Sequence, residues 1–200
     1  MTASEHPSDD DLVARIATGD REAFAALYRR RRPDVYRFAL HVSGSRSAAD
    51  DVTQDVFMAI IHDAARYQSG RSGVVAWLLG IARNHVRRWV ERERPERSRP
   101  DAEGHAARAV AADTDPVAGL ARQQHAAALR RAVLALPVKY REAVVLCDLH
   151  ELSYADAAHA LGCAIGTVRS RLHRGRTLLA GRLRGSDDAE FRSLAARWIL

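Results

Sequence analysis

The sequence has few cysteines, almost no lysine and no long apolar run, and each shortage excludes a class of structure or site. Cys147 and Cys163 are its only two cysteines. They lack the C-x-x-C spacing of a metal or redox site, so we expect buried free thiols and no metal or cofactor. No apolar run approaches the roughly 18 residues of a membrane span, and residues 1–11 are acidic rather than signal-like. We therefore expect a cytoplasmic chain that does not insert into a membrane.

The positive charge of the chain comes almost entirely from arginine. Lys139 is the single lysine among 31 Lys and Arg residues, the net charge is +6 and the pI is about 10.0. This balance predicts a polyanionic partner, with nucleic acid as the first candidate. Guanidinium groups favour bidentate contacts to phosphate and guanine, although genomic base composition alone would give the same arginine bias.

Hydrophobic residues recur at helical rather than alternating spacing along nearly the whole chain, which predicts an all-α fold. The character of the sequence changes after Pro95, because residues 96–120 combine many alanines, two prolines and mixed charges with no aromatic residue. We therefore predict two small helical domains over 8–95 and 121–185, joined by a flexible linker over 96–120. A C-terminal tail over 186–200 carries an apolar stripe that we expect to dock on the chain itself.

Cap and turn residues divide the first domain into successive helices. Ser8 predicts the N-cap of a short helix that Gly19 ends, and a second helix follows from about Asp20. Pro33 fits the first turn of a new helix, because proline lacks the N–H that an interior helical residue donates. A further helix begins near Ser47, and four of its polar residues form an acidic outer face: Asp50, Asp51, Gln54 and Asp55.

A polar loop over 66–73 precedes the last helix of this domain. Helical spacing predicts that this helix has an inner face of five residues: Trp77, Leu78, Ile81, His85 and Trp89. The opposite face would expose polar side chains: Arg83, Asn84, Arg87, Arg88 and Arg92. We expect the two tryptophans to pack in the core rather than stack on bases, and the histidine to be packed rather than a ligand.

The second domain holds the most specific pattern, over residues 153–183. Ser153 fits the N-cap of one helix, and Gly162 supplies the left-handed residue that ends it. The inward residues of the helix after it recur at helical spacing: Ile165, Val168, Leu172, Leu178, Leu179 and Leu183. Its polar face is almost all arginine, with no acid over 164–185. A solvated amphipathic helix would mix both charge signs, so the pattern favours a DNA-reading helix-turn-helix.

Together these features resemble a bacterial RNA polymerase sigma factor of the extracytoplasmic-function type. Three blocks of the first domain carry the resemblance: 23–28 (AFAALY), 49–57 (ADDVTQDVF) and 77–84 (WLLGIARN). Three blocks of the second domain do the same: 136–143 (LPVKYREA), 152–158 (LSYADAA) and 166–172 (GTVRSRL). The predicted linker falls where that family joins its second and fourth sigma domains, which would be the two domains of this chain.

The resemblance implies a role for each polar surface. The acidic outer face is implied to bind core RNA polymerase: Asp50, Asp51, Gln54 and Asp55. The loop and the helix after it are implied to bind melted DNA of the promoter −10 element: Tyr67, Gln68, Ser69, Arg71, Arg83, Asn84, Arg87 and Arg88. The second helix of the helix-turn-helix is implied to bind the −35 element: Thr167, Arg169, Ser170, Arg171, His173 and Arg174. Among these last residues we expect Arg171 and Arg174 to make the more important contacts.

The implied function is that of an alternative sigma factor, without catalytic activity, which directs core RNA polymerase to specific promoters. Members of this family are usually held inactive by an anti-sigma factor, and we expect such a partner. Two other classes stay open. A stand-alone helix-turn-helix regulator would explain residues 153–183 but gives the acidic face and the Asn84 helix no role. A nuclease or recombinase would need a convergent carboxylate or histidine cluster, whereas the acids here lie on outward faces or in the linker.

Overall fold

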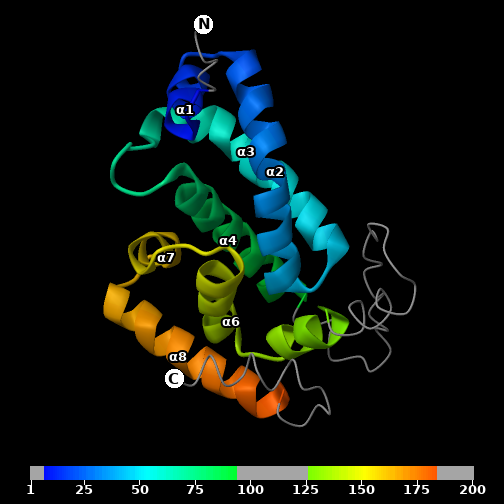
Figure 1. Ribbon diagram of the computed structural model, residues 1–200. Helices are drawn as coiled ribbons and strands as arrows, with labels where there is room; N and C mark the ends of the chain where they lie inside the picture. Colours follow the sequence, from blue (N-terminus) through cyan, green and yellow to red (C-terminus); the bar gives the residue numbers. More distant parts are fainter. Residues whose placement is uncertain (1–6, 94–125, 184–200) are drawn as a thin grey trace, which may run out of the picture.

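The computed structural model describes residues 7–93 and 126–183, and every regular element in these ranges is helical (Figure 1). The predicted all-α class is thus confirmed for this part of the chain. The residues predicted as linker (96–120) and tail (186–200) lie outside the described residues. None of the described helices is long and apolar enough to cross a membrane.

The first helix, α1 (Asp9–Ala17), begins and ends where the cap residues predict. The Ser8 hydroxyl accepts a hydrogen bond from the Asp11 N–H (3.1 Å), and the Asp11 carboxylate accepts one from the Ser8 N–H (3.0 Å). This capping box satisfies backbone donors that the first turn leaves without partners. The chain then turns through Gly19, whose φ of 89° is a conformation that favours glycine.

The predicted helix boundary at Pro33 is wrong. Helix α2 (Arg21–Ser43) runs unbroken, with the proline inside it. Its buried face continues on both sides of the proline: Ala23, Leu27, Val35, Phe38, Ala39 and Val42. Burying a large apolar side chain contributes about 1.5–3 kcal/mol, so several of them together outweigh the ~3 kcal/mol that an interior proline costs.

The next elements lead to the polar loop. Gly44, with a φ of 75°, ends α2, and Ser45 caps α3 (Arg46–Asp63) by accepting a hydrogen bond from the Ala48 N–H. Helix α3 buries the apolar residues that its spacing predicts: Val52, Val56, Phe57 and Ile60. A single 3-10 turn, η1 (Ala64–Arg66), follows, and the loop then runs to α4 (Val74–Glu93).

The inner face of α4 differs from the predicted one. Its fully buried residues are Val74, Ala76, Leu78, Leu79, Ala82 and Val86. Of the five residues predicted to be inside, only Leu78 is buried, and the other four are half-buried: Trp77, Ile81, His85 and Trp89. The reason is that α4 packs against α2 and α3 on one side and against α7 (Tyr154–Leu161) on the other. The contact with the second unit shifts its buried stripe.

The second unit contains the predicted helix-turn-helix. A helix over 126–134 is followed by α6 (Val138–Val144), which begins after Pro137, and by one π-helical turn, η3 (Val145–Leu149). Helix α7 is capped by Ser153 and ended by Gly162 (φ 58°), and α8 (Ile165–Leu183) packs on α6 and α7. Ile165, predicted to be inward, is 43% exposed, because the helix begins at the edge of the unit.

Both predicted thiols are free but half-buried rather than buried. Cys147 lies in η3 and Cys163 in the turn between α7 and α8. Burial, with a smaller contribution from Asp148, raises the pKa of the Cys147 thiol to about 11. A thiol with such a pKa is a poor nucleophile at neutral pH, which agrees with a packing role.

The two units pack against each other and share one hydrophobic core. Figure 1 shows α4 in the middle of the molecule, with α2 and α3 on one side and α6 and α7 on the other. A Cβ on Gly80 of α4 would lie 3.4 Å from the Cα of Ala160 in α7, so these helices approach closely. The ring of His150 packs on Phe38 of α2 with 6.1 Å between centroids.

Candidate polymerase and nucleic-acid interfaces

The acidic outer face predicted on α3 is exposed. We call it the acidic ridge, and its four residues are Asp50, Asp51, Gln54 and Asp55. The opposite face of the same helix is buried in the core, which fixes the ridge on a rigid element. The Oδ2 atom of Asp55 lies 3.1 Å from Nδ1 of His85, so one member of the ridge already has a partner on α4.

A groove of about 410 Å³ runs along the acidic ridge, and the sequence predicted only Asp50 and Gln54 of its lining as interface residues. Its walls combine aromatic, polar and charged side chains: Phe24, Tyr28, Arg32, Asp50, Thr53, Gln54, Phe57 and Met58. The Tyr28 and Phe57 rings pack edge to face at 4.7 Å, while Met58 and Ile61 are about half exposed. Exposed apolar residues beside charges are typical of a protein-binding surface. The signal available in the sequence was that Met58 and Ile61 are apolar although they lie outside the buried stripe of α3.

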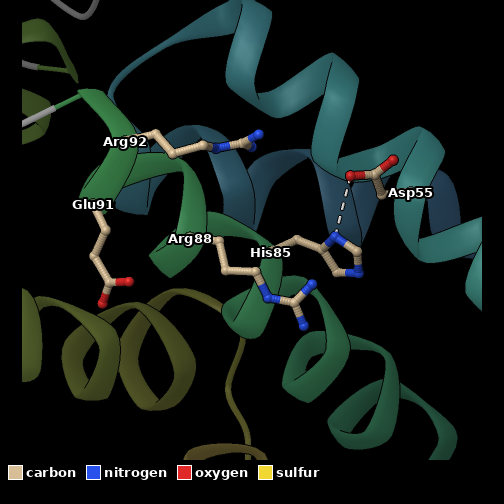
Figure 2. Close-up of a pocket in the computed structure, with 5 residues that line it drawn as sticks. All are labelled: Asp55, His85, Arg88, Glu91 and Arg92. Carbon is tan, nitrogen blue, oxygen red and sulfur yellow. Dashed lines mark hydrogen bonds and ion pairs between the residues drawn. The ribbon is translucent and has the colours of Figure 1, made fainter.

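A second, open pocket of about 620 Å³ lies between α3 and α4 (Figure 2). It is lined by residues of both charge signs: Asp55, His85, Arg88, Glu91 and Arg92. Figure 2 shows Arg88 and His85 side by side, with the ring turned toward Asp55 of α3. The prediction that His85 is simply packed in the core therefore needs correction: it connects α4 to the acidic ridge.

The polar loop over 67–73 is held at both ends. The Tyr67 hydroxyl lies 2.8 Å from Asp10 Oδ1 and 2.9 Å from the Ser72 carbonyl, and Ser69 Oγ donates to the same Asp10 oxygen (2.9 Å). Burial and the neighbouring Asp10 carboxylate raise the pKa of Tyr67. Three of the four predicted loop residues are exposed: Gln68, Ser69 and Arg71. Tyr67 is half-buried and orders the loop.

The basic face of α4 is split between solvent and the second unit. Asn84 and Arg88 are exposed as predicted, so their side chains are available to a ligand. Arg83 was predicted to be exposed, but its side chain is only 12% exposed and its Nε lies 3.1 Å from Glu142. Arg87 is 46% exposed, and its Nε lies 3.3 Å from the same carboxylate. Sequence reasoning missed Glu142 because it lies 55 residues or more from both arginines along the chain.

The exposed face of α8 carries the residues predicted for the −35 element. Arg169, Ser170, His173 and Arg174 are exposed, whereas Thr167 and Arg171 are half-buried. The Arg169 guanidinium lies 5.7 Å from the centre of the Tyr154 ring, a cation–π contact that orients it. Because Arg171 points toward Cys163 (4.0 Å), Arg174 is the freer of the two arginines expected to dominate DNA contact.

A salt bridge holds α8 against η3 of the same unit. Arg176 donates two hydrogen bonds to Asp148 of η3, at 2.6 and 3.2 Å. Hydrogen bonding to Asp148 raises the pKa of Arg176 despite its partial burial. Arg182, near the end of α8, also donates to the Ala135 carbonyl at 3.2 Å. The arginines of α8 therefore divide into two that bond to the rest of the unit and others that face solvent, which is the arrangement that a groove-binding helix needs.

The two units match two models of one protein class. The Sigma-70 region 2 model matches residues 27–96, and the Sigma-70, region 4 model matches residues 126–179. The fold and its polar surfaces thus define a sigma-70-type transcription factor with an acidic ridge and a helix-turn-helix.

Relatives define the class more closely. The chain is 36% identical over 178 residues to ECF RNA polymerase sigma factor SigE of Mycolicibacterium smegmatis, covering 86% of this chain and 68% of the relative. It is 37% identical to ECF RNA polymerase sigma factor SigM of Mycobacterium tuberculosis, covering 86% and 83%. The chain belongs to the ECF RNA polymerase sigma factors, as its sequence motifs predict.

Two solved structures share the fold. The sigma factor RpoE of Bartonella quintana, in complex with the anti-sigma factor NepR, has a TM-score of 0.61 and 29% identity, covering 84% of this chain and 99% of that one. CnrH, in complex with the cytosolic domain of CnrY, has a TM-score of 0.65 and 24% identity, covering 90% and 100%. At 24% identity, the similarity to CnrH shows a shared fold and no more.

Proposed function

We propose that this sigma factor binds its partners through three surfaces, which lie on the domains over 8–95 and 121–185. The first domain docks on core RNA polymerase and binds melted −10 DNA, and the second binds −35 duplex. The chain has no catalytic activity of its own in this proposal and acts in the cytoplasm, where the polymerase is. The observation that carries the proposal is that an acidic, a mixed polar and a basic surface lie on three different elements of one chain.

The acidic ridge is the proposed docking surface for core polymerase. Asp50, Asp51 and Gln54 are exposed on a helix whose other face is buried, so the backbone that carries them is already ordered before a partner binds. Carboxylates on such a helix attract an arginine-rich partner and set its orientation. The groove with Met58 at its edge would add apolar contact area beside the charges.

The loop and α4 are the proposed −10 surface. Gln68, Ser69 and Arg71 are exposed on a loop whose ends are tied to α1 and α7, which suits recognition of an unstacked base. Asn84 offers an amide that pairs with a base edge through two hydrogen bonds. Arg83, Arg87 and Arg88 would hold the phosphate backbone of the single strand.

The exposed face of α8 is the proposed −35 surface. Arg169 and Ser170 lie near the start of the helix, where such a helix meets base edges in the major groove, and His173 and Arg174 lie further along, where it meets phosphates. Thr167 and Arg171 flank this face and are half-buried.

An anti-sigma factor is the proposed regulatory partner. The Bartonella quintana sigma factor, which shares this fold at 29% identity, was solved with its anti-sigma factor. We extend that mode of control to this chain, because the groove and the ridge offer an inhibitor the same apolar and acidic contacts that the polymerase would use.

A reversal of charge on the ridge tests the proposal. Asp51 is the most suitable residue for the substitution, because Asp55 already pairs with His85 and a change there would also alter that contact. In a titration of labelled core polymerase, Asp51→Lys should bind at least tenfold more weakly than the wild type, and transcripts from a promoter-fragment library should fall in parallel. Glu22→Lys, an equal charge change at an exposed site on α2, is the matched control. Equal binding by both variants would remove the ridge from the interface.

A further inference from the structure

One carboxylate oxygen of the first helix contacts two side chains of the polar loop. Asp10 Oδ1 accepts a hydrogen bond from the Tyr67 hydroxyl (2.8 Å) and another from the Ser69 hydroxyl (2.9 Å). Asp10 lies in the first turn of α1, 57 residues before Tyr67 and 59 residues before Ser69. The proposed function gives Asp10 no role, although it contacts two residues of the proposed −10 surface.

The helix that carries Asp10 is held firmly on the rest of the first unit. Its apolar face is buried in the core, and η1, which leads into the loop, packs on it. The neighbouring Asp9 pairs with Arg30 (2.7 Å) and Arg31 (2.5 Å) of α2. Because the backbone of α1 is fixed in this way, the Asp10 carboxylate is a rigid point to which the loop is tied.

Tyr67 joins the beginning of the loop to its end. Its hydroxyl also lies 2.9 Å from the Ser72 carbonyl, and its ring packs on Trp77 of α4 with 5.0 Å between centroids. The hydroxyl therefore brings together the two ends of the loop and the Asp10 carboxylate. These contacts lie within the first unit, so they do not depend on the position of the second unit.

The contacts of Asp10 divide the loop side chains into two kinds. Ser69 is exposed, but its hydroxyl hydrogen is donated to Asp10, so it is not available for a base. Gln68 and Arg71 are exposed on either side of Gly70, whose φ of 86° favours glycine. The Arg71 N–H donates to the Gln68 carbonyl at 3.3 Å, and Arg71 Nη1 lies 3.4 Å from Gln68 Oε1. The turn thus presents an amide and a guanidinium side by side.

Base discrimination by these two side chains requires a fixed orientation of the loop. An amide or a guanidinium distinguishes bases through the directions of paired hydrogen bonds to the base edge. A hydroxyl bonded to a carboxylate is held more strongly than one bonded to a neutral oxygen. A loop that is ordered in advance also loses less entropy when it binds its ligand. The hydrogen bonds to Asp10 therefore favour discrimination between bases as well as affinity.

We propose that Asp10 is a positioning residue of the −10 surface, which holds the loop through Tyr67 and Ser69. The loop then presents Gln68 and Arg71 to an unstacked base in one orientation. The proposal rests on the proposed function, because it takes the loop to bind a base of the −10 element. It adds to that surface a residue that does not touch DNA, and it assigns Ser69 to positioning rather than to contact with the base.

Transcription from a randomised library tests the proposal in the complete system. The full chain and core RNA polymerase transcribe barcoded promoter fragments randomised over the −35 and −10 elements, and sequencing of the transcripts gives the base preference at each position. Gln68→Ala and Arg71→Ala identify the position that the loop reads. At that position Asp10→Ala should lower the base preference at least fivefold, while preferences at the −35 element should change less than twofold. Asp10→Asn keeps an acceptor oxygen in place and should restore part of the preference.

Asp9→Ala is the matched control. It removes the same charge from the adjacent residue and breaks the pairs with Arg30 and Arg31, yet it leaves the contacts of the loop intact. It should keep the wild-type base preferences even where thermal unfolding, followed by circular dichroism, shows it to be as destabilised as Asp10→Ala. An equal loss of preference in both variants would show that Asp10 only supports α1, and would overturn the proposal.

Variants of the two hydroxyls test the same contact from the side of the loop. If Ser69 acts through Asp10, Ser69→Ala should add less than twofold to the loss of preference in Asp10→Ala, because the two residues form one contact. Losses that multiply would show direct contact of Ser69 with DNA and overturn its assignment. Tyr67→Phe keeps the ring and removes the hydroxyl, and it should lower the preference at least threefold. This variant keeps the test possible if Asp10→Ala does not fold.

The outcomes separate the two proposals. A wild-type preference in Asp10→Ala, with altered preferences in Gln68→Ala and Arg71→Ala, would overturn the role of Asp10 and leave the loop a base-reading element. Transcription by Asp10→Ala that falls without any change in preference would have the same meaning. Wild-type preferences in all of the loop variants would overturn the assignment of the loop itself.

Discussion

Single residues set how closely the helices of this molecule approach. Gly175 is buried on α8, where a Cβ would lie 2.7 Å from a methyl carbon of Val144 and 3.3 Å from the Tyr140 carbonyl. Gly181, on the same helix, has no atom within 4 Å of the place of a Cβ. The first glycine is therefore required by packing against α6, and the second is not.

Alanine substitutions at these two glycines should have opposite effects. Gly175→Ala forces α8 away from α6 and should lower the free energy of unfolding by about 1–3 kcal/mol, as overpacking does. Gly181→Ala should raise it by roughly 0.5–1 kcal/mol, because alanine loses less backbone entropy in a helix. Urea unfolding followed by circular dichroism measures both. A stabilised Gly175→Ala would contradict the close packing of α6 and α8.

Residue-level prediction from the sequence succeeded where the signal is local. Ser8, Ser153 and Gly162 act on atoms within a few residues of themselves, so their roles as caps could be predicted and are confirmed. Glu142 could not be placed in the same way. Nothing beside it in the sequence indicates a partner, because Arg83 and Arg87 come to it only through packing of the two units.

At the scale of elements, helix α2 connects the two units. It packs on α1, α3 and α4 of the first unit, and it also contacts α6 and η3 of the second. The sequence predicted a break at Pro33, since proline cannot donate the helical hydrogen bond. The break is absent because the apolar stripe continues across the proline into contacts with both units, and such tertiary contacts are not visible in a local pattern.

The junction of α2 with the turn after η3 should weaken in acid. Burial lowers the pKa of His150 to about 4, with Arg37 and His41 also opposing its protonation and Asp34 favouring it. Because the unfolded histidine titrates near 6.5, unfolding takes up a proton between about pH 6.5 and 4. The free energy of unfolding should therefore fall as the pH drops through this window, by at most ~1.4 kcal/mol per unit and per proton.

Urea unfolding at pH 7.5 and pH 5.0 measures this effect. The wild type should lose stability between the two values, and His150→Gln, which cannot take up the proton, should lose less. Burial also lowers the pKa of His41, so part of the loss should remain in the variant. An equal loss in both proteins would show that His150 does not carry the pH dependence.

At the scale of the whole molecule, the two surfaces proposed to bind DNA differ in exposure. The face of α8 is open to solvent, whereas the face of α4 is shared with a carboxylate of the second unit. The family and its two regions could be predicted from the sequence, because the motifs of each region are local. The packing of one region on the other could not, because it depends on contacts between residues that are far apart in the chain.

The central claim is that polymerase binds the acidic ridge while α4 and α8 bind two separate elements of one promoter, which requires the packed units to move apart. Fluorescence energy transfer tests it directly, between dyes at Thr18→Cys in the first unit and Thr177→Cys on α8, both exposed positions, with Cys147 and Cys163 replaced by serine. Transfer should be high in the free chain and fall when core polymerase and promoter DNA are added. A transfer efficiency that stays at the free-chain value in a transcribing complex would contradict the account.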